Sequence, residues 1–295
     1  MSVVLTGSNG QLGQCIQDEC KQLGIHLHPL TKKYMPIEDS SQVDYIFNKL
    51  QPSIVINAAA YTNVDKAETD IDEAFMVNAA GPEILGHACN KRGIPLIHIS
   101  TDFVFDGKSK KKYIPQDKPN PTSIYGKSKL LGEENIIKIC KKFYIIRTSW
   151  VFSNYGNNFL KTILKLGNTK DELSLIDDQV GCPTSANDLA KAIVRNLENF
   201  KSGKNNNSIY HYSGNQSCSW FDFAKFILKK GHELGYIQSM PIIKPIHTIH
   251  YKALVATRPQ FSALDSSYFC ETFNVQKSDW KTAVEKIIEE LCLAK

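Results

Sequence analysis

Near its start the chain reads Ser2-Val3-Val4-Leu5-Thr6-Gly7-Ser8-Asn9-Gly10-Gln11-Leu12-Gly13, a short apolar run followed by a glycine-rich turn. The apolar run predicts a buried strand, and the residues after Gly10 predict a helix that continues to about Leu23. Glycines spaced in this way allow a tight turn and a close approach of the backbone to a ligand. Free N–H groups at the start of such a helix bind phosphate well. This stretch therefore predicts a dinucleotide-binding unit, with a plain glycine turn as the alternative.

Strands and helices alternate along the first half of the chain. Four further stretches predict strands of a sheet, at 26–30, 54–56, 96–99 and 143–147. Such alternation is typical of an α/β fold with a right-handed, doubly wound parallel sheet. Beyond about residue 150 the alternation becomes irregular. We therefore expect a dinucleotide-binding domain over 1–150, which also takes strands from about 173–212, and a smaller, interleaved substrate domain formed mainly by 151–295.

The composition is that of an ordinary globular protein. Of the 295 residues, 42% are hydrophobic and 22% are charged, as is usual for soluble domains. No apolar run approaches the ~18 residues of a membrane span, and no signal peptide is visible. The eight cysteines show no CxxC pairing, which favours reduced thiols in the cytoplasm. We expect a cytoplasmic protein with neither a membrane nor a nucleic-acid partner, since the basic run Lys108–Lys112 has no aromatic interleaving.

Candidate catalytic residues lie at and after the end of the strand at 96–99. Thr101 stands at the carboxyl end of that strand, where open α/β sheets bind ligands. Tyr125 and Lys129 are one helical turn apart and share a face of the helix that follows. A lysine ammonium within ~4–6 Å lowers the pKa of a phenol from its usual ~10, so that the pair donates a proton to a developing alkoxide. The alternative is a tyrosine packed under a surface helix, because this spacing is common by chance.

The residues after the second strand bear on the choice of nicotinamide. Folds that prefer NAD usually place a carboxylate there for the ribose hydroxyls. This chain has Lys32 and Lys33 instead, and two ammonium groups suit a 2′-phosphate. The pattern favours NADPH, with NADH possible. Two solvated lysines in a loop are the alternative.

Motifs in both halves of the chain point to one family. The first half contains Thr6-Gly7 with Gly10-Gln11-Leu12-Gly13, Asn57-Ala58-Ala59-Ala60-Tyr61-Thr62, Val77-Asn78-Ala79, Ser100-Thr101-Asp102 and Tyr125-Gly126-Lys127-Ser128-Lys129. The second half contains Arg147-Thr148-Ser149-Trp150-Val151-Phe152, Asp178-Gln179, Arg258-Pro259 and Asp279-Trp280. Together they resemble the dTDP-4-dehydrorhamnose reductase family of extended short-chain dehydrogenases/reductases. The resemblance covers nearly the whole chain.

The resemblance implies a Rossmann fold and reduction of the C4 ketone of dTDP-4-dehydro-L-rhamnose to dTDP-L-rhamnose, for surface polysaccharide or lipopolysaccharide biosynthesis. It implies that Tyr125 is the proton donor, that Lys129 tunes it and binds the nicotinamide ribose, and that Thr101 helps to hold the keto oxygen. Residues implied along the cofactor are Gly7, Asn9, Gly10, Gln11, Leu12, Asp39, Ala59, Ala60 and Tyr61. Residues implied near the sugar are Val64, Asp65, Thr101, Asp102, Phe103 and Trp150.

Arg258 is our own candidate for binding the substrate diphosphate. The forked guanidinium group suits two phosphate oxygens. A surface salt bridge is the alternative role for this side chain.

Two departures from the family pattern qualify these expectations. Phe103 stands where the family usually has a tyrosine, so the first alternative is a reductase of a different nucleotide 4-keto sugar. Gln14-Cys15 stands where some members have a glutamate that helps to hold a magnesium ion between two subunits. We therefore expect no metal site, and a monomer or a weak homodimer.

Two other functions are considered. One is a non-catalytic relative, such as a methionine adenosyltransferase regulatory subunit, and the intact Thr101, Tyr125 and Lys129 argue against it. The other is an epimerase with tightly held NAD, which the basic Lys32-Lys33 pair disfavours.

Overall fold

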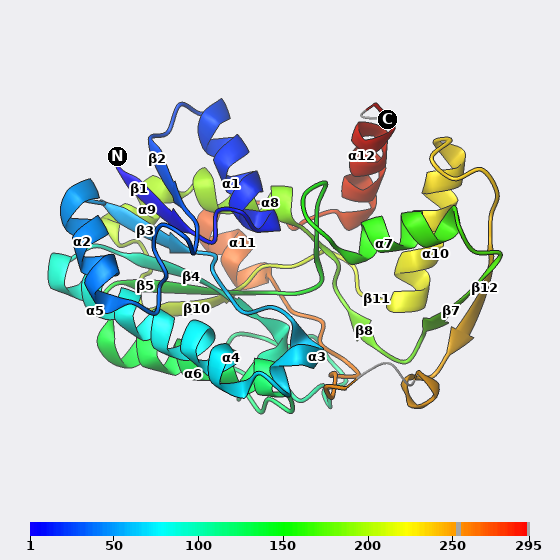
Figure 1. Cartoon of the computed structure of the whole chain (residues 1–295), viewed down its shortest axis with the longest axis horizontal. Coiled ribbons are helices and arrows are strands. Elements are labelled where there is room, and N and C mark those ends of the chain that lie inside the picture. The colour runs from blue at the N-terminus through cyan, green and yellow to red at the C-terminus, as the bar shows by residue number, and fades with distance from the viewer. Residues whose placement is uncertain (252–254, 294–295) are drawn as a thin grey trace.

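A six-stranded, entirely parallel sheet forms the centre of the larger part of the molecule (Figure 1). The computed structural model describes residues 1–251 and 255–293. The strands lie in the order β10-β5-β4-β3-β1-β2. Their bounds are β1 Val3–Thr6, β2 Leu27–Leu30, β3 Ile54–Asn57, β4 Leu96–Thr101, β5 Phe143–Thr148 and β10 Ser208–His211. The predicted α/β fold with a doubly wound parallel sheet is confirmed.

The strand order reverses between β1 and β3. From β1 the chain proceeds outward to β2, and it then returns to β3 on the other side of β1 before continuing to β4 and β5. In open parallel sheets the crevice beyond such a reversal binds the ligand. The turns that follow Thr6 and Asn57 lie at this crevice, because the two residues are paired in the sheet.

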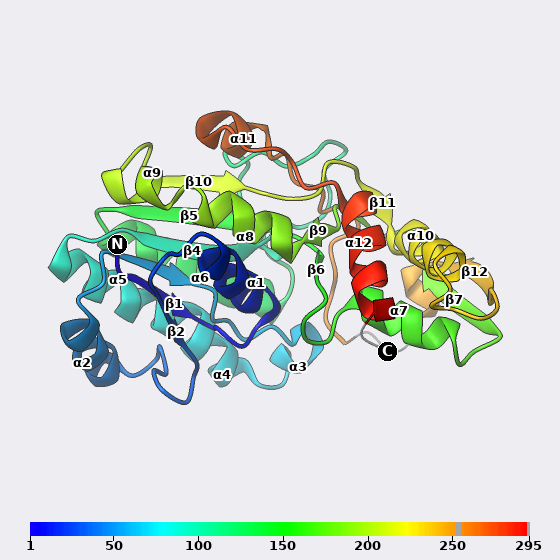
Figure 2. The ribbon, with the colours of Figure 1, turned by 90° about the horizontal axis from the view of Figure 1, so that it is seen from above.

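Helices cover both faces of the sheet (Figure 2). Alternate side chains along β1 enter different cores, since Val3 and Leu5 pack on one face and Val4 on the other. The first face is covered by α1 Gln11–Gln22, α8 Ala186–Val194, α9 Leu197–Ser202 and α11 Ser267–Phe273. The second is covered by α2 Ser40–Leu50, α5 Gly81–Arg92 and α6 Ile124–Ile139. Shorter helices, α3 Val64–Ala67, α4 Ile71–Phe75, the π-helix η1 Met76–Ala80 and the 3-10 helix η2 Asp102–Val104, complete the first half.

The second half of the chain builds a smaller unit with its own apolar core (Figure 1). Its helices are α7 Phe159–Gly167, α10 Trp220–Glu233 and α12 Trp280–Leu293, and its paired strands are β7 Glu172–Ile176 and β12 Ile242–Ile246. Leu164, Phe223 and Val284 are buried where these helices meet. Short strand pairs connect this unit to the large sheet, namely β6 Val151–Phe152 with β9 Thr184–Ser185 and β8 Val180–Gly181 with β11 Cys218–Ser219.

The range of about 173–212, from which we expected additions to the large sheet, contains the longer strands β7 and β10 besides the short β8 and β9. β10 does join that sheet beside β5. β7 instead pairs with β12, and its Leu173 and Leu175 belong to the core of the smaller unit. Across 1–251 and 255–293, no helix is both long and apolar enough to cross a membrane.

Candidate active site

A cleft of about 600 Å³ lies beyond the carboxyl ends of the central strands, where the strand order reverses. Both halves of the chain line it. The first half contributes Asn9–Gly13, Ala58, Ala60, Thr62, Val64, Ile99–Phe103, Tyr125 and Lys129. The second half contributes, among others, Trp150, Asn158, Gln179, Trp220, Arg258 and Ser262. Thirteen of the residues predicted for the site therefore share one cavity: Asn9, Gly10, Gln11, Leu12, Ala60, Val64, Thr101, Asp102, Phe103, Tyr125, Lys129, Trp150 and Arg258.

The glycine turn after β1 places backbone groups, without covering side chains, at the edge of this cleft. Gly7 has a φ of +66°, and a Cβ there would overlap the backbone of Ala58 and Ala59. This glycine lets the turn after β1 lie directly against the turn after β3. Gly10 precedes the first turn of α1 and offers no capping side chain, so the first N–H groups of the helix remain available to an anion. These features fit the pyrophosphate of a dinucleotide.

Thr101 and Tyr125 meet on the floor of the cleft. Thr101 ends β4, and Tyr125 lies in the first turn of α6, where the Ser123 hydroxyl accepts a hydrogen bond from the Gly126 N–H at 3.1 Å. The two side chains are hydrogen-bonded to each other. Phe103 packs edge-on against the Tyr125 ring, with 5.4 Å between centroids. The predicted pair of hydroxyls is thus held on one side of the cavity.

Lys129 lies one turn further along α6 and is only 2% exposed. Its Nζ donates to the Ile99 carbonyl oxygen at 2.7 Å and lies 3.4 Å from Nε2 of His98. The lysine is therefore fixed from the β4 side. His98 was not among the predicted site residues, and only its place in a buried strand could have suggested it.

The pKa values of the two side chains differ from the expectation. Burial raises the pKa of Tyr125 to about 12, and its hydrogen bond with Thr101 offsets part of that rise. Burial also lowers the pKa of Lys129 to about 8, opposed by the nearby Glu133 carboxylate. The prediction that the lysine brings the phenol's pKa down is wrong for this structure, because removal from water is the larger effect.

An ion pair between the two halves of the chain borders the cleft. Asp65 Oδ2 accepts from Arg258 Nη2 at 2.7 Å. Asp65 Oδ1 also accepts from the backbone N–H groups of Val255 and Ala256, at 3.1 and 3.0 Å. The salt bridge that we held as the alternative role for Arg258 is therefore present, and it places the guanidinium group in the lining of the cleft.

Two tryptophans of the cleft lining form an aromatic wall. Trp150 has a φ of +46° and stacks on Trp220, with 3.5 Å between centroids and 7° between planes. A Cβ on Gly181 would overlap the Trp150 indole, so a glycine there makes room for the ring. Trp220 was not predicted for the site. No local motif marks it, because it meets Trp150 only through the folding of the smaller unit.

Asp102 is buried at the end of β4, in the lining of the cleft. Burial raises its pKa to about 6, and the hydroxyls of Ser262 and Thr101 oppose that rise. A carboxyl group in such a position accepts hydrogen bonds from the hydroxyls of a ligand.

The model of the RmlD substrate binding domain family matches residues 1–293. The chain belongs to this family. It is 36% identical to the dTDP-4-dehydrorhamnose reductase of Aggregatibacter actinomycetemcomitans, over 97% of both chains. The predicted family is confirmed.

Solved structures of relatives agree with this membership. A dTDP-4-dehydrorhamnose reductase from Clostridium acetobutylicum has a TM-score of 0.90 and 37% identity, covering 99% of this chain and all of its own. A dTDP-4-dehydrorhamnose reductase from Bacillus anthracis, solved in complex with NADP, has a TM-score of 0.87 and 34% identity, covering 100% of this chain and 99% of its own.

Several residues predicted along the cofactor of this RmlD-family chain lie outside the lining of the cleft. Lys32 Nζ pairs with Glu73 at 2.9 Å and with Glu38 at 3.4 Å, while Lys33 is exposed. Asp39 caps α2 by accepting from the Gln42 N–H at 3.0 Å. The other predicted cofactor residues outside the lining are Gly7, Ala59 and Tyr61. Gly7 and Ala59 lie where the turns after β1 and β3 touch, and the Tyr61 hydroxyl donates to Asp70 at 3.0 Å. Asp65, which we predicted near the sugar, is also outside the lining and contacts it through Arg258.

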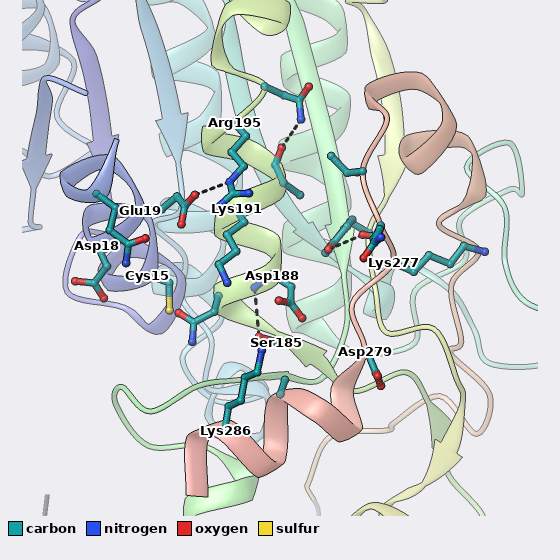
Figure 3. A pocket seen from close by; sticks show the side chains of 18 of the residues that line it. Cys15, Asp18, Glu19, Ser185, Asp188, Lys191, Arg195, Lys277, Asp279 and Lys286 are labelled. Atoms are coloured by element: carbon teal, nitrogen blue, oxygen red, sulfur yellow. Dashed lines mark hydrogen bonds and ion pairs between the residues drawn. The ribbon is translucent and has the colours of Figure 1, made fainter. Parts of the chain in front are cut away.

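A larger hollow of about 1400 Å³ lies between α1, α8 and α12 (Figure 3). None of the predicted site residues lines it. Within its lining, Arg195 binds Glu19 at 2.7 Å and the Tyr155 hydroxyl donates to Asp18 at 2.6 Å. Cys15 also faces this hollow. Within the part of the chain that the structure describes, no three His, Cys, Asp or Glu side chains are grouped to hold a metal ion.

Proposed function

We propose that this protein is an NADPH-dependent dTDP-4-dehydrorhamnose reductase, which reduces the C4 ketone of dTDP-4-dehydro-L-rhamnose to dTDP-L-rhamnose. The observation that carries the proposal is the position of Thr101, Tyr125 and Lys129 in the same cleft as the glycine turn. Relatives with this name match nearly the whole chain, and one of them was solved with NADP. The reaction makes the protein an oxidoreductase of dTDP-rhamnose biosynthesis.

NADPH supplies the hydride for C4 when it is bound along the glycine turn. The hydroxyls of Thr101 and Tyr125 hold the keto oxygen as negative charge develops on it. Tyr125 then gives its phenolic proton to that oxygen, and Lys129 takes part in returning a proton to Tyr125. The products are the alcohol and the oxidised nicotinamide.

The raised pKa of Tyr125 is compatible with this role. An alkoxide is nearly as basic as hydroxide, whose conjugate acid has a pKa of ~16. A phenol with a pKa of about 12 is still the stronger acid, so the proton moves downhill once the alkoxide forms. Until then the phenol keeps its proton at neutral pH.

Several side chains of the cleft suit the binding of a nucleotide sugar. Asp102 accepts hydrogen bonds from sugar hydroxyls, and the Trp150–Trp220 wall offers an apolar face to a flat or ring-shaped group. Arg258 supplies the positive charge for the diphosphate. Phe103 packs on Tyr125 and contacts the sugar without a hydroxyl of its own.

The remaining features of the proposal concern setting and assembly. The dinucleotide-binding domain comprises 1–150 with β10 and the helices α8, α9 and α11 that cover its sheet, and the substrate domain is formed mainly by the rest of 151–295. The protein works in the cytoplasm, as a monomer or a weak homodimer, in the biosynthesis of a surface polysaccharide such as lipopolysaccharide. Neither nucleic acid nor a membrane is its partner.

A panel of dTDP- and UDP-linked 4-keto sugars tests the function. Purified protein is mixed with each sugar and NADPH, and the loss of reduced nicotinamide is followed by absorbance. We expect the highest kcat/KM with dTDP-4-dehydrorhamnose. A higher value with another sugar would favour the alternative substrate, for which Phe103→Tyr is the matched variant. No oxidation with any sugar, with NADPH still bound, would favour a non-catalytic relative.

A further inference from the structure

A buried chain of polar side chains crosses the sheet and ends at Lys129. The Thr6 hydroxyl donates to Asn57 Oδ1 at 2.6 Å, and Asn57 Nδ2 lies 2.9 Å from His98 Nδ1. The other ring nitrogen of His98, Nε2, lies 3.4 Å from Lys129 Nζ. Asn57 and His98 are fully buried, and Thr6 and Lys129 are nearly so. These four buried side chains therefore connect three neighbouring strands to one catalytic lysine, and water does not reach them.

The direction of the hydrogen bonds along this chain is fixed by the backbone. The Ala59 N–H donates to Asn57 Oδ1 at 3.2 Å. A backbone N–H is only a donor, so this atom of Asn57 is the oxygen and the other is the NH₂ group. The NH₂ group faces His98 Nδ1, which must then accept. A neutral imidazole carries one hydrogen, and in His98 that hydrogen is on Nε2.

His98 is neutral in this position. Burial lowers its pKa well below the ordinary value, and the charge of Lys129 acts in the same direction. The imidazole thus presents an N–H to Lys129, and not a lone pair.

The protonation state of Lys129 decides whether this contact is favourable. An ammonium has three N–H donors and no acceptor, whereas an amine has a lone pair. Nζ already donates to the Ile99 carbonyl oxygen at 2.7 Å. A Lys129 amine can donate to the Ile99 carbonyl oxygen and also accept a hydrogen bond from the His98 Nε2–H. With a Lys129 ammonium, the N–H groups of the lysine and of His98 would face each other as two donors.

We infer that His98 is a positioning residue for Lys129, which holds the lysine nitrogen between two fixed groups of β4 and favours the amine over the ammonium. The inference rests on the proposed role of Lys129 in returning a proton to Tyr125. A lysine that exchanges its proton near neutral pH serves that role better than one that keeps it.

Few other titratable groups face the lysine nitrogen among the described residues. They are Glu133 of α6, whose carboxylate raises the Lys129 pKa, and His98 of β4, whose Nε2 lies 3.4 Å from Nζ. Glu133 is itself bound by Arg147 of β5, with Nη2 and Oε2 2.6 Å apart, which reduces its attraction for the Lys129 ammonium. His98 is therefore the neighbour whose replacement should move the Lys129 pKa upward.

The tautomer of His98 is measured first, in the native protein and without substrate. Long-range ¹H–¹⁵N correlation spectra distinguish protonated from unprotonated ring nitrogens. We expect His98 to be protonated at Nε2 alone. His211 is an internal control of the opposite kind, because its Nδ1 lies 2.9 Å from the Tyr113 carbonyl oxygen and must carry the hydrogen. A proton on His98 Nδ1 at neutral pH would overturn the inference.

Two variants then test the effect on Lys129. In His98→Asn the amide oxygen replaces Nδ1 and keeps the bond from Asn57, but nothing replaces Nε2–H. In His98→Gln the amide group reaches the place of Nε2. We expect the Lys129 pKa, followed by NMR of labelled lysine, to rise by about one unit in His98→Asn and by less in His98→Gln.

The alkaline limb of the pH profile of kcat/KM should move upward by the same amount in His98→Asn. An unchanged Lys129 pKa in a folded His98→Asn protein would contradict the inference. If that variant does not fold, the tautomer of the native protein decides. The NMR readings need no turnover, so failure of the inference is distinguishable from failure of the proposed reaction.

Discussion

The Asp65 carboxylate binds the Arg258 guanidinium at 2.7 Å, although 193 positions separate the two residues. The bond ties α3, next to the turn after β3, to the segment that precedes Pro259 in the second half of the chain. Asp65 also holds the backbone of that segment through Val255 and Ala256. The Asp65 carboxylate therefore joins the two halves of the chain and holds the Arg258 guanidinium group at the cleft.

Replacement of Arg258 tests whether that cation binds the substrate diphosphate. We predict that Arg258→Gln raises KM for the nucleotide sugar about ten-fold or more, since a charge-assisted pair with phosphate is lost. The Kd of NADPH should change by less than about two-fold, and kcat should fall less than KM rises. Steady-state kinetics and fluorescence titration measure these values. Arg195→Gln is the matched control, because Arg195 forms a similar 2.7 Å ion pair outside the cleft. Equal effects of the two substitutions would mean that Arg258 is only structural.

The aromatic wall depends on the glycine that makes room for it. In Gly181→Ala the new methyl group would overlap the Trp150 indole, so the ring must leave its stack on Trp220. We predict a change in tryptophan fluorescence and a rise of about ten-fold in KM for the nucleotide sugar. Gly86→Ala in α5 is the control, because a Cβ there meets only ordinary contacts at 3.9 Å. Unaltered fluorescence and KM in Gly181→Ala would exclude a role for the stack in binding.

Local sequence predicted those parts of the site that adjacent residues build. The glycine turn, the end of β4 and the spacing of Tyr125 and Lys129 each lie within one strand–turn–helix unit, and the structure brings them together. Contacts between distant segments had no such pattern. The Trp150–Trp220 stack and the His98–Lys129 contact arise only when separate elements pack.

The sequence also could not predict the direction in which the pKa of Tyr125 is shifted. Spacing places an ammonium near the phenol, but it does not tell how far both groups are removed from water. Burial determines the result here, with Lys129 bound to the Ile99 carbonyl. The same reason applies to Lys32, whose partner Glu73 comes from a helix 41 positions away.

Asp102 should make stability depend on pH in a defined direction. Its pKa is raised from 3.8 to about 6 in the folded protein, so between these values the folded state keeps a proton that the unfolded state has lost. The folded state is therefore destabilised as pH rises through this window, by up to about 3 kcal/mol above pH 6.

Asp102→Asn removes that pH dependence. We predict that the variant gains stability relative to the native protein between pH 4 and pH 7, and that it loses kcat/KM because a hydrogen-bond acceptor for the sugar is gone. Urea unfolding at a series of pH values measures the first effect. A stability difference that is constant across this range would show that Asp102 does not titrate as described.

The ion pair between Lys32 and Glu73 bears on the choice of nicotinamide. If Lys32 serves the 2′-phosphate, Glu73→Gln releases a competing partner, and NADPH should bind about three-fold or more tightly while NADH is unaffected. Lys32→Ala with Lys33→Ala should weaken NADPH more than NADH. Glu233→Gln, which breaks an ion pair of similar length with the partly exposed Lys230, at 3.0 Å, is the control. Equal changes for both nicotinamides would mean that the lysines do not bind the 2′-phosphate.

The decisive test of the proton-transfer mechanism is the rate of Tyr125→Phe with dTDP-4-dehydrorhamnose and NADPH. Phenylalanine keeps the ring against Phe103 and removes only the hydroxyl that bonds to Thr101. Loss of a general acid typically costs about 10²–10⁴-fold in rate, so we predict a fall in kcat of that size with the Kd of NADPH unchanged. A kcat within about three-fold of the native value would contradict Tyr125 as the proton donor.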